Sequence, residues 1–435
     1  MFPGRFRLAL LLLLILFGTR VGSLCAQSSS PKLKFDFGPG KVTLGYAQVV
    51  AETIYDKTSG YGFEPGANIS CVDRGGDSLR GDLCTSEKPF YFSVALPEGN
   101  YSVTVTLGDS DAATVTTIKA ELRRLMLERV ETAKGKFVTR TFTVNVRTPV
   151  IAGDGEVRLK DREKTTESWA WDEKLTLEFN NSRPSVCAIE IKPVEVPTVY
   201  LLGDSTVCDQ PSEPYNSWGQ MLTRFFKPGI AIANHAESGE SLHSSLAAQR
   251  LDKVLSVLKP GDYLIIQYGH NDEKEKGEGI GAFTSYKSDL KKFVDEARKR
   301  GAHPVLVTPV QRRSFDAAGK ITNSHGDYPE AVRQLAKEED VPLIDLNAMS
   351  KLLYEAWGPD LSKQAFAPND NTHHNNYGSY ELAKCVVAGI KTAKIDLASY
   401  LVTDVASFDP RRPDPIDSFK LPPSPQANSL KPLGN

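Results

Sequence analysis

From Thr198 onward the chain alternates short apolar runs with longer segments of helical periodicity, and this alternation restricts the folds open to it. The apolar runs, each the length of a strand, cover residues 199–202, 230–233, 263–268, 305–308 and 343–345. The helical segments cover residues 217–226, 244–258, 286–300, 328–339, 348–357 and 377–394. Continuous apolar strands that alternate with helices are typical of a parallel sheet covered on both faces. We therefore predict an α/β domain of five parallel strands over residues 198–406.

A different pattern precedes this domain, in residues 32–195. Apolar segments 90–96 and 101–107 flank the turn-rich Pro97-Glu-Gly-Asn100, which predicts a β-hairpin. Further strand-like segments lie at residues 34–37, 137–146, 157–159, 174–179 and 186–191. Several short strands separated by turn signals predict a β-sandwich. The two prolines in residues 191–197 indicate a linker, and a chain of 435 residues is long enough for two cores.

The first 26 residues have the order of a secretory signal peptide. Arg5 and Arg7 precede an apolar run over residues 8–17, and small or polar residues follow as far as Ala26. The run is too short to span a bilayer as a helix. We expect cleavage near Ala26 and a secreted or periplasmic protein. A lipoprotein anchored through Cys25 is disfavoured, because Leu24 is larger than lipoprotein processing sites usually accept.

Charge and cysteine content exclude several other classes of function. The formal net charge of −2 gives no electrostatic case for binding nucleic acid or an anionic membrane. No Cys-x-x-Cys or His-x-x-x-His pair supports a structural zinc site, and no Gly-x-Gly-x-x-Gly follows the first strand of the α/β domain. Cys71 and Cys84 could form a disulfide in an oxidising compartment, or both could be buried thiols.

Two further segments leave alternatives open. The aromatic residues Tyr61, Phe63, Trp169 and Trp171 could line a sugar-binding face of the β-sandwich or pack in its core. Residues 407–435 are rich in proline and aspartate and lack a hydrophobic period. We expect this tail to lie along the surface or to be partly disordered.

Polar residues follow the predicted parallel strands at the points where the strands end. The tripeptide Gly-Asp-Ser occurs three times, but only Gly203-Asp204-Ser205 ends an apolar strand that precedes a helix. Gly239 follows the second strand, Gly269-His270-Asn271-Asp272 follows the third, and Asp370-Asn-Thr-His373 precedes the last helix. Ligands bind beyond the carboxyl ends of such strands, so we expect these residues to converge there.

Their chemistry indicates nucleophilic catalysis. Ser205 is the predicted nucleophile, and its hydroxyl needs a base. His373 suits that role, and Asp370, three residues earlier, can fix the tautomer of its ring. His374 is the alternative base, disfavoured by its spacing from Asp370. Asp204 is expected to stabilise the turn at Ser205. His270 is expected to be a packing residue and not an acid or base.

Three groups are predicted to bind the oxyanion of the reaction. They are the backbone N–H groups of Ser205 and Gly239 and the side-chain amide of Asn271. Gly239 suits this role because a residue without a Cβ lets the backbone approach the substrate closely. This chemistry requires no metal ion and no organic cofactor.

The four motifs at Ser205, Gly239, Asn271 and His373 resemble those of the SGNH (GDSL-like) hydrolases, and the similarity covers residues 198–395. Within that superfamily the chain is similar to the rhamnogalacturonan acetylesterases, on residues 202–207, 268–272, 308–309 with 312–313, and 370–373. The resemblance implies a flavodoxin-like α/β hydrolase domain. The β-rich segment and the C-terminal tail resemble extensions found in bacterial members of the family. For the β-rich segment the resemblance implies a galactose-binding-like sandwich. One departure is Glu237-Ser-Gly-Glu240, where many members carry Gly-Arg-Ser, so the arginine beside Gly239 is absent.

We therefore expect a secreted carbohydrate esterase, acting as a monomer, that removes O-acetyl groups from acetylated pectic polysaccharide or oligosaccharide. Arg312 and Arg313 could contact a uronate carboxylate or lie in a solvated loop. His325 and Tyr328 could border the substrate cleft. The alternatives are an acetylesterase for another glycan such as xylan, a lipase-like esterase, and a glycan-binding protein whose esterase domain is inactive.

Overall fold

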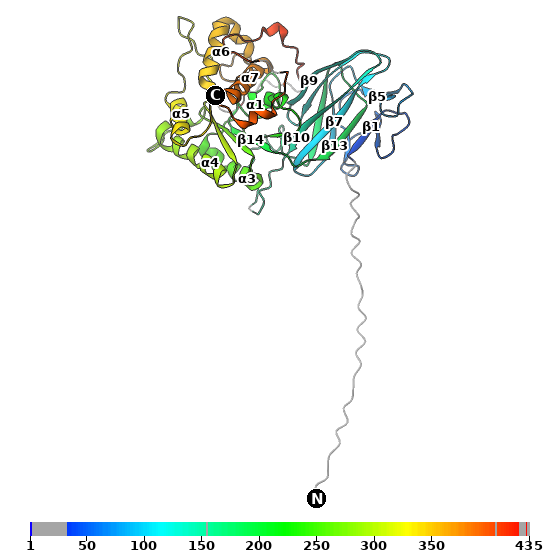
Figure 1. The fold of residues 1–435 in the computed structure, drawn as a ribbon, viewed down its shortest axis with the longest axis horizontal. Coiled ribbons are helices and arrows are strands. Elements are labelled where there is room, and N and C mark those ends of the chain that lie inside the picture. Colours follow the sequence, from blue (N-terminus) through cyan, green and yellow to red (C-terminus); the bar gives the residue numbers. More distant parts are fainter. Residues whose placement is uncertain (2–32, 154, 405–406, 426–431, 433–435) are drawn as a thin grey trace. The chain divides into compact units, whose positions relative to one another are not determined.

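The computed structural model describes residues 1, 33–153, 155–404, 407–425 and 432 (Figure 1). The predicted signal peptide and Cys25 lie outside these residues. Within these ranges no helix combines the length and the apolar character needed to cross a membrane.

The N-terminal part, as far as Pro193, consists of two five-stranded sheets and a small three-stranded sheet. The first sheet has the order β10 (Lys136–Val146), β7 (Gly99–Asp109), β13 (Ala188–Pro193), β1 (Lys34–Phe37) and β2 (Ala47–Val49). The second has the order β3 (Tyr61–Phe63), β6 (Phe90–Ala95), β11 (Lys174–Arg183), β8 (Thr114–Ala120) and β9 (Arg124–Thr132). The third has the order β12 (Ser185–Val186), β5 (Asp82–Thr85) and β4 (Ser70–Asp73). All neighbouring strands are antiparallel except β1 and β2.

Alternating side chains of the facing strands form the core of this β-domain. Phe35, Phe37, Phe63 and Phe92 are fully buried and meet edge to face. Burying each ring stabilises the fold by about 1.5–3 kcal/mol. Cys71 and Cys84 face each other on β4 and β5 and form a disulfide.

The four aromatic residues that could have lined a sugar-binding face are mainly packing residues. Phe63 and Trp171 are buried, the ring of Tyr61 packs at a tilt against Phe35, and Trp169 meets the ring of Tyr91 edge to face.

The β-domain differs from the sequence-based expectation in several strands, since the short strands β2 to β5 were not predicted. Residues 157–159 do not form a strand, because the backbone of this segment bonds outside the sheets, as where Arg158 N donates to Ala248 O at 3.0 Å. Conversely, β8 and β9 were not predicted. They carry Lys119, Arg124 and other charged side chains that are almost fully buried, which hides the apolar alternation expected of a core strand.

The C-terminal part is a parallel five-stranded sheet with helices on both faces (Figure 1). Its order is β15 (Ala231–Asn234), β14 (Thr198–Gly203), β16 (Tyr263–Gln267), β17 (His303–Val307) and β18 (Leu343–Ile344). The helices are α1 (Trp218–Leu222), α2 (Leu242–Ala247), α3 (Arg250–Val257), α4 (Lys287–Lys299), α5 (Tyr328–Glu338), α6 (Leu346–Leu361) and α7 (Asn376–Thr392). The strand order 2-1-3-4-5 is that of flavodoxin-like folds, as the resemblance implied.

Side chains that alternate along the strands divide the core into two layers. Val199 and Leu201 of β14 pack with α1, α6 and α7, whereas Tyr200 and Leu202 pack with α2, α3, α4 and α5. Strands buried on both faces explain why the sequence showed continuous apolar runs there.

The β-domain and the α/β domain share buried contacts. Leu125 of β9 belongs to the apolar core formed with α1, α6 and α7. The C-terminal tail also contacts both domains: Tyr377 of α7 donates to Asp414 O at 2.6 Å, and Lys119 of β8 donates to Ser424 Oγ at 2.7 Å. Ser424 is 5% exposed, so this part of the tail is packed rather than merely lying along the surface.

Candidate active site

Strand β14 places Ser205 at the carboxyl end of the parallel sheet. Gly203, its last residue, leaves no room for a side chain, because a Cβ there would lie 2.6 Å from Gln267 O of β16. The chain then turns tightly, with Val207 N and Cys208 N both donating to Asp204 O at 3.0 Å. This turn lifts Ser205 out of the strand, where its hydroxyl can meet groups from other loops.

The predicted triad is assembled. Ser205 Oγ lies 2.8 Å from His373 Nε2, and His373 Nδ1 lies 3.0 Å from Asp370 Oδ2. Ser205 and His373 are each 1% exposed. A ring that donates from Nδ1 to the carboxylate presents an unprotonated Nε2 to the serine hydroxyl. The geometry is therefore that of a nucleophile, a general base and an orienting carboxylate.

The segment Asp370–His373 forms this arrangement locally. Asp370 Oδ1 accepts from the backbone N–H groups of Thr372 at 2.8 Å and His373 at 3.0 Å. Burial alone would raise the pKa of Asp370, but the hydrogen bonds and charge of His373, with the two backbone donors, hold it well below its usual range. Asp370 is thus ionised wherever His373 can act as a base.

His374, the alternative base, faces away from Ser205. The Tyr354 hydroxyl lies 2.6 Å from its Nε2, and Phe366 packs against its ring. Burial lowers its pKa to about 3, so the ring is neutral and structural at ordinary pH.

Asp204 and His270 stabilise the turn that carries Ser205. Asp204 Oδ1 accepts from Thr206 N at 2.9 Å and Thr206 Oγ1 at 2.8 Å, and its Oδ2 lies 3.1 Å from His270 Nδ1. Burial lowers the pKa of His270 to about 4 against the opposing charge of Asp204. A neutral His270 donating to an ionised Asp204 fits the roles expected for both.

The three predicted oxyanion donors lie in the loops that follow β14, β15 and β16. Gly239 has φ +78°, a conformation that residues with a side chain rarely adopt. Asn271 Nδ2 donates to Glu240 O at 2.9 Å, which ties the loop after β16 to the loop after β15. An amide nitrogen carries two protons, so Asn271 retains one for the substrate.

The residues predicted to contact a uronate are held by the protein itself. Arg312 forms an ion pair with Glu273 at 2.5 Å, and Arg313 Nη2 donates to Asn371 Oδ1 at 2.7 Å. His325 is buried and bridges Glu273 Oε2 at 2.7 Å and Val310 O at 2.8 Å. Glu273 offsets the charge of Arg312, so this guanidinium is oriented before any substrate arrives.

Several residues near the site were not identified from the sequence. Gln210 Nε2 donates to Ser205 O at 2.7 Å and to Ser238 Oγ at 3.2 Å, joining the nucleophile turn to the Gly239 loop. Lys160 and Arg162, from the β-domain, both contact that loop. One sequence feature indicates the need for Lys160 and Arg162. The carboxylates Glu237 and Glu240 flank Ser238-Gly239, and no basic residue lies next to them in the sequence.

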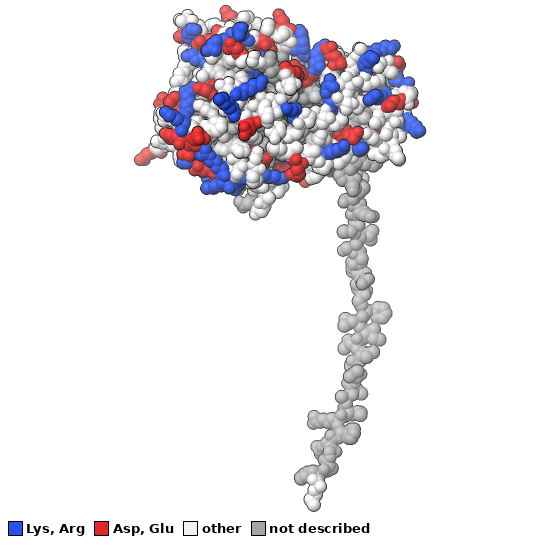
Figure 2. All heavy atoms as spheres, viewed as in Figure 1, with Lys and Arg blue, Asp and Glu red and all other residues white. Residues whose placement is uncertain are grey.

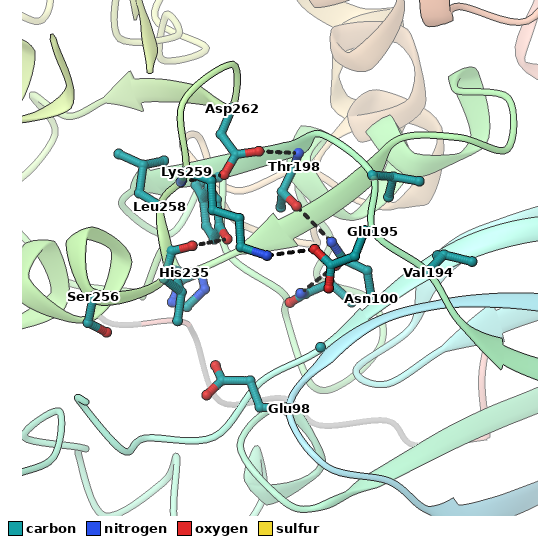
Figure 3. A pocket seen from close by; sticks show the side chains of 15 residues that line it. Glu98, Asn100, Val194, Glu195, Thr198, His235, Ser256, Leu258, Lys259 and Asp262 are labelled. Atoms are coloured by element: carbon teal, nitrogen blue, oxygen red, sulfur yellow. Dashed lines mark hydrogen bonds and ion pairs between the residues drawn. The ribbon is translucent and has the colours of Figure 1, made fainter. Parts of the chain in front are cut away.

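A separate cavity of about 400 Å³ opens at the other end of the parallel sheet (Figure 3). Thr198, at the start of β14, lines it, whereas Ser205 follows the end of that strand roughly 20 Å away at 3.3 Å per residue. Its polar groups are largely paired: Asp262 accepts from Thr198 N at 2.8 Å, and Asn100 donates to Thr198 Oγ1 at 2.8 Å. We assign it no part in the chemistry at Ser205.

Basic and acidic side chains are intermingled over the face drawn in Figure 2. That face carries no broad area of a single sign, which agrees with the formal net charge of −2.

Comparison with protein families agrees with the two-domain architecture. Residues 201–379 match the GDSL-like lipase/acylhydrolase family. Residues 33–146 match a domain described as beta-agarase/YXIM esterase-like, galactose-binding domain-like. These matches confirm the predicted fold class, a galactose-binding-like β-domain before a hydrolase domain.

Individual relatives extend the similarity. Rhamnogalacturonan acetylesterase RhgT of Bacillus subtilis is 43% identical over 227 residues, covering 49% of this chain and 96% of that protein. Uncharacterized esterase YxiM of Bacillus subtilis is 30% identical over 378 residues, covering 84% of this chain and 92% of that protein. The solved structure of the YxiM protein covers 83% of this chain and 99% of its own, at 28% identity and a TM-score of 0.45.

Proposed function

This chain belongs to the GDSL-like lipase/acylhydrolase family and is a carboxylic ester hydrolase, and on that premise we propose that it is a secreted esterase that removes O-acetyl groups from pectic polysaccharide. The observation that carries the proposal is the hydrogen-bonded series Ser205–His373–Asp370 in a chain that is 43% identical over 227 of its residues to a rhamnogalacturonan acetylesterase. The signal-peptide pattern of residues 1–26 supports secretion.

The proposed reaction has two halves. In the first, Ser205 Oγ attacks the acetyl carbonyl carbon while its proton passes to His373 Nε2. Negative charge on the carbonyl oxygen is stabilised by the N–H groups of Ser205 and Gly239 and by Asn271. His373 then gives its proton to the sugar oxygen as the carbon–oxygen bond breaks, which leaves an acetyl-enzyme and a free sugar hydroxyl.

In the second half His373 removes a proton from water, and the water oxygen attacks the acetyl carbon. Collapse of this intermediate releases acetate, and the proton returns to Ser205. Asp370 stays ionised throughout and stabilises the imidazolium that forms twice in each cycle. Ser205 supplies the proton that leaves on the sugar, water supplies the proton that restores Ser205, and His373 carries both.

Two further features favour an acetylated, polar substrate over a long acyl chain. The loops that follow the parallel strands carry polar side chains such as Asn271, Glu273 and Arg312. The oriented guanidinium of Arg312 suits a uronate carboxylate, because the planar fork of arginine matches carboxylate geometry.

The test is a comparison of substrates with the wild-type protein. We expect acetate release from acetylated rhamnogalacturonan-containing pectin at a higher kcat/KM than from acetylated xylan, and little hydrolysis of long-chain acyl esters. Preference for xylan would move the substrate assignment to another glycan. No hydrolysis of any acetyl ester, with no labelling of Ser205 by a serine-reactive phosphonate, would mean that the domain is inactive and at most binds glycan.

A further inference from the structure

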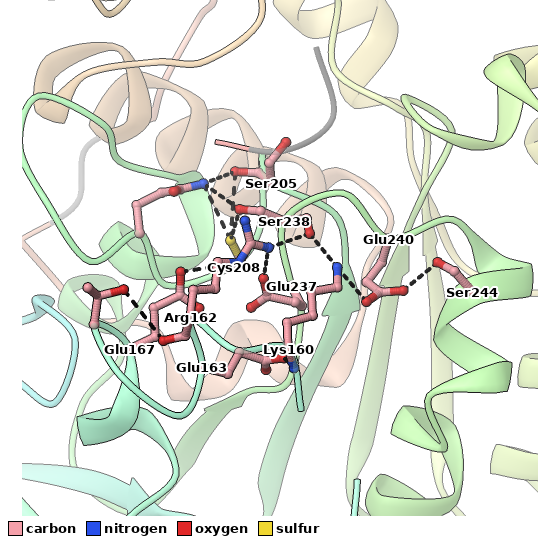
Figure 4. Close-up of polar contacts among 12 residues, drawn as sticks. Lys160, Arg162, Glu163, Glu167, Ser205, Cys208, Glu237, Ser238, Glu240 and Ser244 are labelled. Atoms are coloured by element: carbon pink, nitrogen blue, oxygen red, sulfur yellow. Dashed lines mark hydrogen bonds and ion pairs between the residues drawn. The ribbon is translucent and has the colours of Figure 1, made fainter. Parts of the chain in front are cut away.

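A charged segment of the β-domain lies against the loop that carries Gly239 (Figure 4). The segment, residues 157–171, follows β10 and belongs to no sheet. It supplies Lys160 and Arg162, and the loop supplies Glu237, Ser238 and Glu240. The catalytic machinery described above uses none of these side chains.

Both cations bind the same backbone oxygen. Lys160 Nζ donates to Ser238 O at 2.7 Å, and Arg162 Nη2 donates to Ser238 O at 2.6 Å. That carbonyl belongs to the peptide unit whose other end is the N–H of Gly239. Because a trans peptide is planar, its C=O and N–H point in opposite directions, so fixing the one aims the other. Two cationic donors on the oxygen also polarise the unit and make its N–H a stronger donor.

The carboxylates on either side of the peptide hold the same two cations. Arg162 is paired with Glu237, and Lys160 Nζ lies 2.7 Å from Glu240 Oε1. Glu237, Ser238 and Glu240 are each at most 5% exposed, so the loop's side of these contacts is buried, whereas Lys160 and Arg162 are partly exposed. Arg250 adds a further link, since it bonds Glu163 of the segment at 2.6 Å and lies 3.4 Å from Glu240.

The peptide needs such support because of its local conformation. Gly239 has φ +78° and no Cβ, so side-chain packing does not oppose rotation of the Ser238–Gly239 peptide plane. The loop itself offers no basic residue between Glu237 and Glu240 to restrain it. The restraint comes from another domain.

We propose that Lys160 and Arg162 are positioning residues for the esterase reaction: they orient and polarise the Ser238–Gly239 peptide so that its N–H stabilises the oxyanion. The β-domain is then part of the catalytic apparatus and not only an attached glycan-binding module. The inference rests on the proposed function of Ser205 and Gly239, but not on which sugar carries the acetyl group.

The experiment measures hydrolysis of p-nitrophenyl acetate by the full chain, because this small ester makes no glycan contacts. Removing an oxyanion donor outright lowers kcat about 10²- to 10³-fold. We expect the misdirected donor of the Lys160→Met/Arg162→Met variant to lower kcat by roughly 10- to 100-fold, with KM changed less than about threefold. Arg162→Lys keeps a cationic donor and should retain most of the activity.

Arg158→Ala is the matched control. Arg158 lies in the same segment and donates to Ala247 O at 3.0 Å, so it contacts the α/β domain away from the Gly239 loop. We expect wild-type kcat and KM from it. Lys160→Met is the second test, because the Lys160 side chain is 30% exposed and its loss should not prevent folding. It should lower kcat several-fold at an unchanged melting temperature.

The inference would be overturned by wild-type kcat in a folded Lys160→Met/Arg162→Met or Lys160→Met variant, or by an equal loss of kcat in Arg158→Ala. A rise in KM alone would also contradict it, since that would indicate a ground-state contact. Failure of the proposed function looks different, because the wild type would then be inactive or Ser205→Ala would be as active as the wild type.

Discussion

At the scale of single residues, the position of one proton decides the chemistry. The proton of Ser205 has an acceptor 2.8 Å away in His373 Nε2, and Asp370 keeps the other ring nitrogen protonated. The pKa of Asp370 is held low by hydrogen bonds to its charged form, so protonating or neutralising it disrupts the whole series.

Asp370→Asn should therefore reduce catalysis with little effect on binding. An amide can donate to His373 Nδ1 and stabilise the wrong tautomer, which leaves no base at Nε2. We expect kcat to fall on the order of 10³- to 10⁴-fold with KM nearly unchanged. Steady-state kinetics on an acetyl ester would show this. Asp204→Asn, which disturbs a turn rather than the base, should lose less, and a greater loss in that variant would reverse the assignment of the two aspartates.

Asn271→Ala tests the side-chain donor of the oxyanion site. We expect kcat to fall about 10²-fold, because one preorganised donor is removed where charge develops in the transition state. Asn271 also bonds Glu240 O at 2.9 Å, so part of the loss would arise from a looser loop. An unchanged kcat would remove Asn271 from the oxyanion site.

At the scale of elements, the sequence predicts those features of the fold and site that depend on residues close to one another along the chain. The parallel strands, their polar C-terminal loops and the Asp370–His373 turn all depend on residues close in sequence, and the order of the four motifs singled out Ser205 among three Gly-Asp-Ser tripeptides. Lys160, Arg162 and Gln210 could not be found in this way. Their partners lie far along the chain or in another loop, and nothing in their own neighbourhood indicates the contact.

Buried charges on β9 and directly after β10 show the same limit. Arg124 and Arg147, each at most 3% exposed, face Asp209 of the α/β domain at 3.4 and 3.7 Å. From the sequence alone, charged residues such as these are predicted to be exposed to solvent. Only the tertiary partner explains how strands that carry them can be buried.

Asp209→Ala should consequently destabilise the protein far more than a surface change. Two buried guanidinium groups would lose their partner, which typically costs about 3–5 kcal/mol in the free energy of unfolding. Urea denaturation would measure it. The control is Glu131→Ala, whose exposed pair with Arg129 should matter by less than about 1 kcal/mol. Equal effects would contradict the structural role of Asp209.

At the scale of the whole molecule, buried histidines couple stability to pH. The folded-state pKa of His374 is lowered to about 3, whereas an unfolded histidine titrates near 6.5. Its neutral form thus contributes stability that is fully present above pH 6.5 and is lost as the pH falls toward 3. The slope is up to about 1.4 kcal/mol per pH unit for one such group.

The variant His374→Gln isolates the contribution of His374 to the pH dependence of stability, because glutamine can still accept a hydrogen bond from Tyr354 but does not titrate. We expect the variant to lose less unfolding free energy than the wild type between pH 6.5 and 4, and to keep its esterase activity. Denaturation at several pH values measures the difference. Parallel curves for the two proteins would show that His374 is not buried in its neutral form, and an inactive, folded variant would make His374 the better candidate for the base.

The central claim, that Ser205 is the nucleophile of an acetylesterase, has a direct test in acetate release by the wild type and by Ser205→Ala. Ser78→Ala is a matched control, because Ser78 belongs to another Gly-Asp-Ser and is exposed on the β-domain. Removing the catalytic serine lowers kcat by about 10⁶-fold in serine hydrolases that have been dissected in this way. We predict loss of acetate release to background in Ser205→Ala and full activity in Ser78→Ala. Wild-type activity in a folded Ser205→Ala variant would contradict the account.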